Sequence, residues 1–136
     1  MNLVLDTNVL IAAFIAKGVC HRLVEHCLRS HQVIASEFIL QELNRNLTQK
    51  FSFSDEDAQS IRVLLQSRIH IVKPIRFPSQ VCRDADDDNI LGTAIAGNAV
   101  CIITGDKDLL SLSPFQTIDI LPPAEFVTYE ERLFSD

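Results

Sequence analysis

The sequence lacks long hydrophobic runs, since none of its apolar stretches reaches the roughly 18 residues that a membrane-spanning helix needs. Residues 1–10 contain no lysine or arginine, and Asp6 interrupts their apolar stretch, which does not fit a secretory signal peptide. Internal repeats, low-complexity tracts and linkers are missing as well. We therefore expect a single domain over residues 1–136, located in the cytoplasm and not in a membrane.

Closely paired cysteines are also lacking. The chain has four cysteines and no C-x-x-C pair, which argues against a disulfide framework. Two of the cysteines lie with two histidines in the segment 20–27, so a zinc site is an alternative to consider there. Buried thiols on an apolar helix face explain this segment better. Its residues are Cys20, His21, His26 and Cys27.

The positive charge that is typical of nucleic-acid-binding proteins is absent, because the formal net charge is −6. The acidic residues are unevenly distributed, however, and eight of the eighteen lie in a few short segments. Without these eight, ten acidic residues face twelve lysines and arginines, a remainder of +2. If the eight surround divalent metal, the charge is compatible with an RNA substrate. They are Asp6, Glu42, Asp84, Asp86, Asp87, Asp88, Asp106 and Asp108.

Short apolar segments alternate with segments of helical periodicity, and 47% of the residues are hydrophobic, enough to form a core. The apolar segments predict strands at residues 3–5, 32–35, 69–72, 100–103 and 117–120. The periodic segments predict helices at about residues 9–15, 19–28, 37–49, 54–67, 87–97, 107–110 and 124–133. This alternation is typical of an α/β fold with a mostly parallel sheet.

Acidic side chains are expected at the carboxyl edge of this sheet, where such folds bind ligands. Asp6 ends the first predicted strand, and Asp106 closely follows the fourth. Asp88 lies at the start of the helix that leads into the fourth strand. Glu42 lies in the helix after the second strand, beside its packed face. We expect these four carboxylates to meet at one rim.

Each of these acids also has a purely structural interpretation. Asp6 and Asp106 are plausible helix N-caps, Glu42 a plausible surface residue, and the run 84–88 a plausible solvated loop. Four carboxylates at one edge would repel each other, however, unless a divalent cation neutralises them. Oxygen ligands without adjacent His or Cys favour Mg²⁺ or Mn²⁺ over Zn²⁺. Such ions activate water and bind phosphates, which favours phosphodiester hydrolysis.

Four motifs follow one another at defined spacings along the chain. They are Leu5-Asp6-Thr7-Asn8-Val9-Leu10, Ser36 with Gln41-Glu42-Leu43, Arg83-Asp84-Ala85-Asp86-Asp87-Asp88, and Ile103-Thr104-Gly105-Asp106-Lys107-Asp108-Leu109-Leu110. Together they resemble the PIN domain family, specifically the VapC-like toxin nucleases, from Leu3 to about Phe126. The resemblance implies a PIN-like three-layer α/β/α sandwich with a five-stranded, mostly parallel sheet. It also implies a metal-dependent ribonuclease.

The resemblance assigns metal binding and water activation to four carboxylates and a further metal-binding role to a fifth. These are Asp6, Glu42, Asp88, Asp106 and, as the further ligand, Asp108. Counting back from Thr104 favours Asp88 over Asp87 as the helix acid, although the neighbouring position stays open. Close relatives often have Asp-Pro where this chain has Asp84-Ala85, which leaves the role of Asp84 open. The implied supporting residues are Asn8, Thr104, Asp84 and Asp87.

The resemblance also implies Mg²⁺ or Mn²⁺ as cofactor, endonucleolytic cleavage of RNA, a homodimer and, for a toxin, a small antitoxin protein as partner. The apolar segments 9–15 and 19–28 are compatible with a dimer interface and equally with core packing. An aspartate-dependent phosphatase needs a second acid two residues after Asp6, where this chain has Asn8. A catalytically silent module that binds RNA or protein is the alternative that the sequence leaves open.

Overall fold

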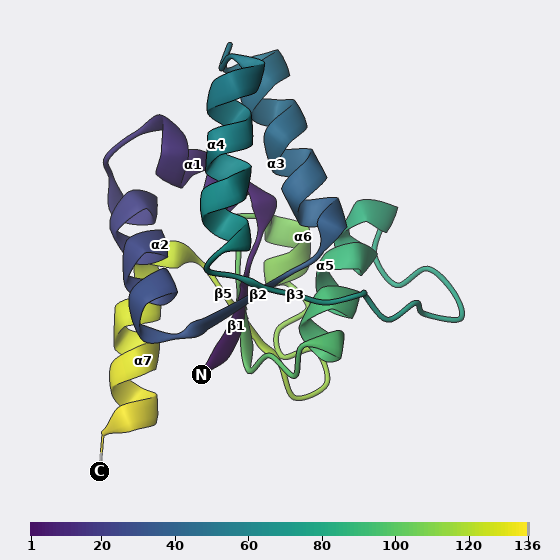
Figure 1. Ribbon diagram of the computed structural model, residues 1–136. Helices are drawn as coiled ribbons and strands as arrows, with labels where there is room; N and C mark the ends of the chain where they lie inside the picture. Colours follow the sequence, from purple (N-terminus) through teal and green to yellow (C-terminus); the bar gives the residue numbers. More distant parts are fainter. Residues whose placement is uncertain (136) are drawn as a thin grey trace.

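A five-stranded parallel sheet forms the centre of the computed structural model, which describes residues 1–135 (Figure 1). Its strands are β1 (Asn2–Leu5), β2 (Gln32–Ala35), β3 (His70–Ile71), β4 (Cys101–Ile103) and β5 (Asp119–Leu121). They are arranged in the order β3-β2-β1-β4-β5, with every neighbouring pair parallel. The strand order therefore reverses between β1 and β4, the position at which open α/β sheets bind ligands.

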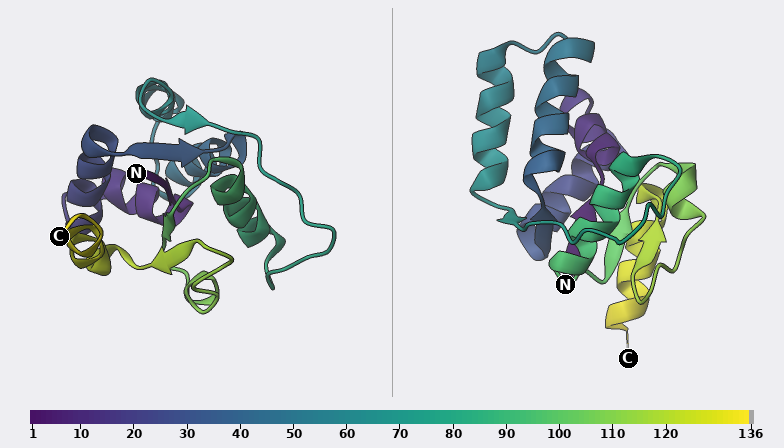
Figure 2. Two further views of the ribbon diagram at one scale, coloured as in Figure 1. Left: turned by 90° about the horizontal axis from the view of Figure 1, so that it is seen from below. Right: turned by 90° about the vertical axis from the view of Figure 1, so that its right-hand side faces the viewer.

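Helices cover both faces of the sheet, as Figure 2 shows. α1, α2 and α7 lie on one face and α5 on the other, while α3 and α4 pair with each other and extend beyond the carboxyl edge (Figure 1). The helices are α1 (Thr7–Ile15), α2 (Val19–Ser30), α3 (Glu37–Lys50), α4 (Asp55–Gln66), α5 (Ala85–Ala96), α6 (Lys107–Leu110) and α7 (Phe126–Phe134), with the 3₁₀ helix η1 (Pro123–Glu125) before α7.

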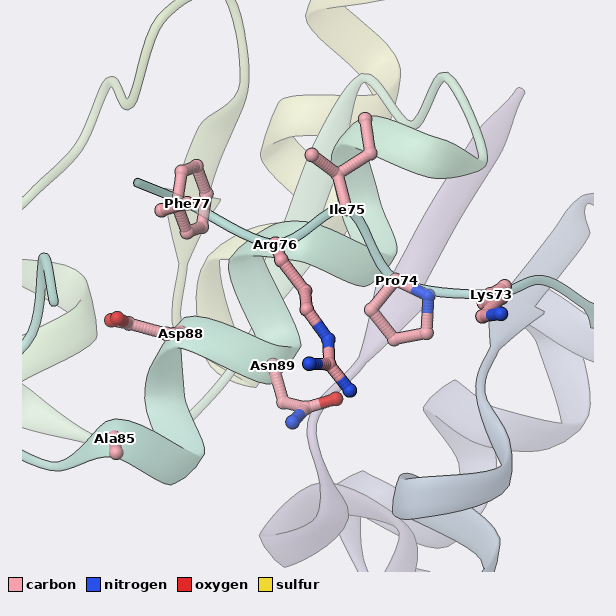
Figure 3. A pocket seen from close by; sticks show the side chains of 8 residues that line it. All are labelled: Lys73, Pro74, Ile75, Arg76, Phe77, Ala85, Asp88 and Asn89. Carbon is pink, nitrogen blue, oxygen red and sulfur yellow. The ribbon is translucent and has the colours of Figure 1, made fainter. Parts of the chain in front are cut away.

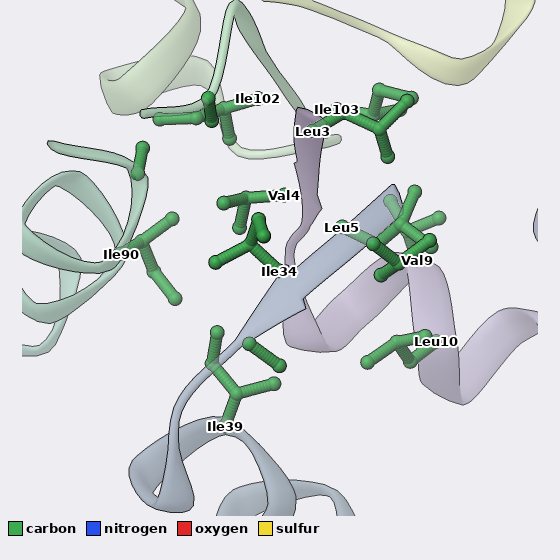
Figure 4. Close-up of a cluster of buried hydrophobic side chains, with 14 of the residues drawn as sticks. Leu3, Val4, Leu5, Val9, Leu10, Ile34, Ile39, Ile90, Ile102 and Ile103 are labelled. Carbon is green, nitrogen blue, oxygen red and sulfur yellow. The ribbon is translucent and has the colours of Figure 1, made fainter. Parts of the chain in front are cut away.

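The central strand β1 is apolar from Leu3 to Leu5 because helices cover both of its faces. Its residues Leu3, Val4 and Leu5 are each at most 1% exposed. In Figure 4 Val4 lies on the side of Ile90 of α5, whereas Leu5 lies on the side of Val9 of α1. The buried strand fixes the position of whatever follows its carboxyl end.

The elements predicted from the sequence all occur, and none of their ends is displaced by more than two residues. The prediction of an α/β fold is confirmed, and the sheet is entirely parallel. The fifth strand begins at Asp119 instead of residue 117, because Phe115 and Ile118 pair with each other in a tight turn. α5 begins at Ala85 instead of residue 87, because the Asp84 carboxylate accepts a hydrogen bond from the Asp86 N–H at 2.9 Å.

The cysteines and histidines of segment 20–27 do not form a common site. Cys27 is fully buried, and burial raises the pKa of its thiol to about 12. His21 Nδ1 lies 3.0 Å from the Ala13 carbonyl oxygen, while His26 faces α7. The interpretation of Cys27 as a buried thiol is confirmed, and Cys20 is half-buried.

Within residues 1–135 no single helix is long and apolar enough to cross a membrane. α1 and α2 reach the required length and composition only as a pair, and the two are bent by 111° at the break between them.

The chain before α5 approaches that helix so closely that only glycine fits at position 92. The Ile75 N–H donates a hydrogen bond of 3.1 Å to the Gly92 carbonyl. A Cβ atom on Gly92 would lie 2.2 Å from the Ile75 carbonyl oxygen, so one of the two backbones would have to move. This contact holds the segment 72–84 against α5.

We therefore expect Gly92→Ala to lower the free energy of unfolding by about 1–3 kcal/mol, the usual cost of overpacking. Urea unfolding measures the effect. Gly18→Ala is the control, since a Cβ there meets nothing within 4 Å, and it should change stability by less than about 0.5 kcal/mol. Equal stabilities for the two variants would contradict the close contact.

Candidate active site at the carboxyl edge of the sheet

Six carboxylates line one cleft of about 280 Å³: those of Asp6, Glu42, Asp87 and Asp106, and those of the exposed Asp84 and Asp86 beside Asp87. Asp6 follows β1, Glu42 lies in α3, Asp87 in the first turn of α5, and Asp106 directly precedes α6. The cleft therefore lies at the carboxyl edge, where the strand order reverses between β1 and β4. The structure brings Asp6, Glu42 and Asp106 together at the predicted edge.

Asp6 is buried and held at both carboxylate oxygens. Its exposed fraction is 6%. Oδ1 accepts a hydrogen bond from the Thr7 N–H at 2.7 Å, and Oδ2 accepts one from the Thr104 hydroxyl at 2.6 Å. The Asn8 side-chain amide also donates to Oδ2, at 3.4 Å. Asp6 is thus the N-cap of α1 as well as a wall of the cleft, so the structural and the functional interpretations apply to the same residue.

Thr104 connects the two strand ends. Its hydroxyl donates to Asp6 and accepts a hydrogen bond from the Asp106 N–H at 3.0 Å. Asp106 Oδ1 in turn accepts from the N–H groups of Asp108 and Leu109, at 2.8 and 3.1 Å, and so caps α6. Asn8 adds a second connection, because its Oδ1 accepts from the Gly105 N–H at 3.4 Å. The predicted supporting residues Thr104 and Asn8 therefore both contact the strand ends.

The placement of Asp88 predicted from the sequence is wrong, and Asp87 occupies the cleft instead. Asp87 is 9% exposed and lines the cleft. The Asp88 carboxylate points elsewhere and accepts hydrogen bonds from the N–H groups of Val81 and Cys82, at 2.9 and 2.7 Å. α5 begins at Ala85, two residues earlier than predicted, so Asp87 and Asp88 both lie in its first turn, where neighbouring side chains point about 100° apart.

Asp88 belongs to a different pocket, between the start of α5 and the segment after β3. Figure 3 shows its side chain extending away from Asn89 and Arg76, below Phe77. Although its partial burial acts in the other direction, hydrogen bonds from the backbone of Val81 and from Cys82 lower the pKa of Asp88. An acid that is stabilised as an anion in this way supports the loop.

The cleft acids disfavour each other's ionisation. Burial, followed by the nearby charges of Asp106 and Asp6, raises the pKa of Asp87 to about 7. Burial also raises the pKa of Asp6, although the hydrogen bonds from Thr104 and Thr7 act against this shift. The structure thus gathers carboxylates where desolvation and repulsion both oppose their charge, which costs stability unless a cation is bound.

One face of α3 extends the cleft outward from the acids. Glu42, Asn46 and Lys50 are spaced four residues apart and all line the cleft, so they share a helix face. The Asn46 side chain donates a hydrogen bond of 2.7 Å to the Glu42 carbonyl, and Arg45 approaches the Glu42 carboxylate at 3.8 Å. Asn46 and Lys50 were not among the residues predicted from the sequence, although their spacing of four residues places them on the same helix face as Glu42.

The donor set fits Mg²⁺ or Mn²⁺, which prefer oxygen ligands. No three of the cleft carboxylates bring ligand oxygens within 4.8 Å of one another. This spacing suits ions that keep several waters and use few protein ligands. The Thr7 hydroxyl beside Asp6 is buried and has no hydrogen-bond partner among residues 1–135. A cation with its waters would neutralise the acids and offer this hydroxyl a partner.

Two further predicted residues lie at the margin of the cleft. Asp84 lines it and is the N-cap of α5, through the hydrogen bond from the Asp86 N–H. Asp108 is exposed in the first turn of α6 and is not among the residues that line the cleft, although its charge contributes to the raised pKa of Asp87. Metal binding by Asp108 stays a prediction.

The parallel sheet and the acidic cleft at its strand reversal define an α/β protein with a candidate site for a divalent metal. The sequence pattern of the PIN domain family matches residues 2–108. The chain therefore belongs to the PIN domain family, whose members are nucleases that generally use divalent metals. This confirms the resemblance found in the sequence motifs.

Individual proteins are similar to the chain over nearly its whole length. The chain is 31% identical to the uncharacterised protein MJ1680 of Methanocaldococcus jannaschii, over 99% of this chain and 95% of that protein. VapBC2 from Rickettsia felis, in a crystal structure bound to a DNA fragment from its promoter, is similar with a TM-score of 0.63 and 19% identity, over 90% of this chain and 98% of that chain. VapBC-1 from nontypeable Haemophilus influenzae is also similar, with a TM-score of 0.63 and 19% identity, over 91% of this chain and 99% of that chain. These structures confirm the predicted PIN-like sandwich.

Asp87 and Asp88 should affect stability in opposite directions, because their pKa values are shifted in opposite directions. In the metal-free protein Asp87 loses its proton near pH 7 when folded but near 3.8 when unfolded. The cost of holding its charge in a buried position beside other acids is therefore absent below about pH 4 and complete above pH 7. We expect Asp87→Asn to raise the melting temperature above pH 7 and to leave it unchanged below pH 4.

Asp88→Asn is the matched comparison. The lowered pKa of Asp88 means that its anion stabilises the fold above its ordinary value of 3.8 and loses this effect as the pH falls through the folded value. This variant should therefore melt at a lower temperature than the parent at neutral pH, with a smaller difference in acid. Thermal unfolding in the presence of chelator, followed by circular dichroism, measures both variants. Shifts of the same sign at pH 7 would contradict the placement of these two residues.

Proposed function

We propose that the chain is a Mg²⁺- or Mn²⁺-dependent ribonuclease that cleaves single-stranded or structured RNA endonucleolytically. The observation that carries the proposal is the convergence of Asp6, Glu42, Asp87 and Asp106 on one cleft at the strand reversal. Burial and the neighbouring negative charges raise the pKa of Asp87, and a perturbed carboxyl group in a cleft is typical of functional sites.

These four acids are the residues that would hold the metal, with Asp87 in the role that the sequence analysis gave to Asp88. Mg²⁺ or Mn²⁺, when bound, would lower the pKa of a metal-bound water molecule and stabilise the negative charge on the phosphate oxygens. Asp106 uses Oδ1 to cap α6, which leaves its second oxygen available to the cleft. Asp84, at the start of α5, and Asp108, in the first turn of α6, would support the site by adding negative charge near the metal.

Thr104 and Asn8 act as positioning residues. The hydroxyl and the amide donate to Asp6 Oδ2, so the carboxylate keeps one orientation at the end of β1. Because Thr104 also accepts from the Asp106 N–H, one hydroxyl sets the distance between two of the acids. Preorganisation of this kind reduces the reorganisation that the reaction would otherwise need.

Positive charge for the substrate comes from the rim. Lys50 lines the outer end of the cleft, and a lysine there favours an approaching phosphate. α1 and α5 both begin at the cleft, with Asp6 and Asp84 as their N-caps. The positive ends of their dipoles favour anions, both the carboxylates and a phosphate group. The choice of RNA as substrate rests on the family.

The cellular role that fits this nuclease is the toxin of a toxin–antitoxin pair, acting in the cytoplasm as a homodimer and neutralised by a small antitoxin protein. The likeness to the VapBC structures supports this role at the level of the fold. The catalytically silent alternative is less favourable, because a complete set of four acids would then be retained at a cost in stability.

We expect the purified chain to cleave total RNA with Mg²⁺ or Mn²⁺ and not with EDTA, with discrete ends when the products are mapped. Asp6→Asn and Asp87→Asn should each lower the rate at least about a hundredfold, because each removes a metal-facing charge. Asp88→Asn is the control and should retain activity at temperatures well below its melting point.

Equal loss of cleavage in Asp87→Asn and Asp88→Asn, with both variants folded, would overturn the assignment of Asp87. Full cleavage by folded Asp6→Asn would overturn the proposed mechanism. The toxin role is tested by expression in a bacterial host, where the parent should arrest growth and Asp6→Asn should not.

Thr104→Val should lower kcat about tenfold to a hundredfold, since a charge-assisted hydrogen bond of about 1.5–3 kcal/mol is lost. Valine keeps the shape of threonine but leaves Asp6 Oδ2 without the hydroxyl. Thr104→Ser restores the donor and should recover most of the rate, which a purely structural role for the threonine methyl group would not produce. Steady-state kinetics on a short RNA substrate distinguish the two outcomes.

A further inference from the structure

A second group of ligand-type side chains lies at the amino edge of the sheet, the end opposite the acidic cleft. His26 belongs to α2, His31 follows α2 directly before β2, and Glu130 belongs to α7. In Figure 1 the end of α2 lies beside α7, which places these segments together although about a hundred residues separate them. The proposed nuclease function does not use this group.

The three side chains converge on one point. His26 Nε2 lies 2.7 Å from Glu130 Oε2, and His31 Nε2 contacts the same carboxylate oxygen. The ligand atoms of the three residues all lie within 4.8 Å of one another, which no other three His, Cys, Asp or Glu residues within 1–135 achieve. Two imidazole nitrogens thus face a single carboxylate oxygen. This arrangement is favourable either when each nitrogen carries a proton and donates it to the oxygen, or when one cation lies among the three atoms.

Aromatic rings hold the histidines in place. The ring of Phe126, which is 1% exposed, packs edge-on against both imidazoles, with centroids 6.4 Å from His26 and 5.9 Å from His31. Phe134 stacks on His31 at 6.3 Å. The His31 side chain is 5% exposed and that of His26 is 38% exposed, so the group is closed on the side of the core and open toward solvent at His26.

We propose that His26, His31 and Glu130 form a zinc site that fastens α7 to α2. Two imidazole nitrogens and one carboxylate oxygen are a donor set that Zn²⁺ uses in proteins, with water in the fourth position. The nitrogen donors distinguish the site from the cleft, whose oxygen donors suit Mg²⁺ or Mn²⁺. With zinc on Nε2, the His31 Nδ1 carries the ring proton, and the Met1 nitrogen 3.2 Å away accepts it only as the neutral amine, so zinc binding should be favoured at alkaline pH, where an α-amino group loses its proton.

The attachment of α7 explains what the metal contributes. Phe126 is the buried residue of this helix, while Val127, Leu133 and Phe134 are 63%, 51% and 66% exposed. The Tyr129 hydroxyl donates to the Asp119 carboxylate at 2.8 Å and supplies one further link to the sheet. With so little apolar burial, α7 gains much of its anchoring from the group around Glu130, and a metal ion there would make this anchoring stronger.

The test uses chelator-treated protein without an oligohistidine tag, with excess Mg²⁺ present to occupy the acidic cleft. Titration with Co²⁺ should give the visible absorption of four-coordinate cobalt at one equivalent, and Zn²⁺ should abolish it by displacement. Zn²⁺ should also raise the melting temperature and slow amide hydrogen exchange in the segment 126–134. None of these readouts depends on cleavage activity.

Two variants remove ligands and two serve as matched controls. His26→Gln and Glu130→Gln should each weaken Zn²⁺ binding at least about tenfold, the smallest loss expected at a metal site. His21→Gln removes a histidine of the same helix that pairs with Glu25 at 3.2 Å, and Glu131→Gln removes the exposed neighbouring acid. Neither control should alter binding. His26 is partly exposed, so its replacement leaves the core intact, as melting without Zn²⁺ verifies.

Absence of a one-equivalent Co²⁺ or Zn²⁺ complex would overturn the proposal and leave a hydrogen-bonded His–Glu–His group. Binding that persists in folded His26→Gln and Glu130→Gln, or that disappears in Asp87→Asn, would also overturn it, because the ion would then occupy another place. Loss of binding in the two ligand variants alone, with slower exchange in α7 in the parent, supports it.

Discussion

One buried hydrogen bond, from the Thr104 hydroxyl to the Asp6 carboxylate, joins the ends of two strands that are 98 residues apart in the sequence. It requires β1 and β4 to be neighbours in register, which in turn requires apolar side chains on both faces of β1. The position of Asp106 follows, since the same hydroxyl accepts its N–H. The acidic cleft is therefore a product of the parallel sheet rather than of any one loop.

Much of this arrangement could be predicted from the sequence, and the error has a clear physical cause. Strand ends are marked by short apolar segments, so Asp6 and Asp106 could be placed with few assumptions. The start of α5 is marked by a run of aspartates, in which several positions suit an N-cap. Asp84 takes the cap, and the backbone N–H groups of Val81 and Cys82 hold the Asp88 carboxylate away from the cleft, contacts that the sequence does not reveal. Contacts between distant segments, such as that of Glu130 with His31, leave no pattern in the sequence.

The two ends of the sheet illustrate different solutions to the burial of polar groups. At the carboxyl edge like charges are collected and held by backbone N–H groups, hydroxyls and helix N-termini. At the amino edge a carboxylate is placed between two imidazoles, groups that satisfy its charge by hydrogen bonding. The first arrangement is poor for stability and suited to chemistry; the second holds two helices together.

The position of β1 has a consequence for protein synthesis. Of the five strands of the sheet β1 leaves the ribosome first, yet it is the central strand of the finished sheet. β2 can pair with it early, whereas β4 is translated about a hundred residues later. Until then the nascent chain has an open strand edge and an Asp6 carboxylate without its threonine donor. The cleft therefore cannot form until the segment that contains Thr104 and Asp106 has been translated.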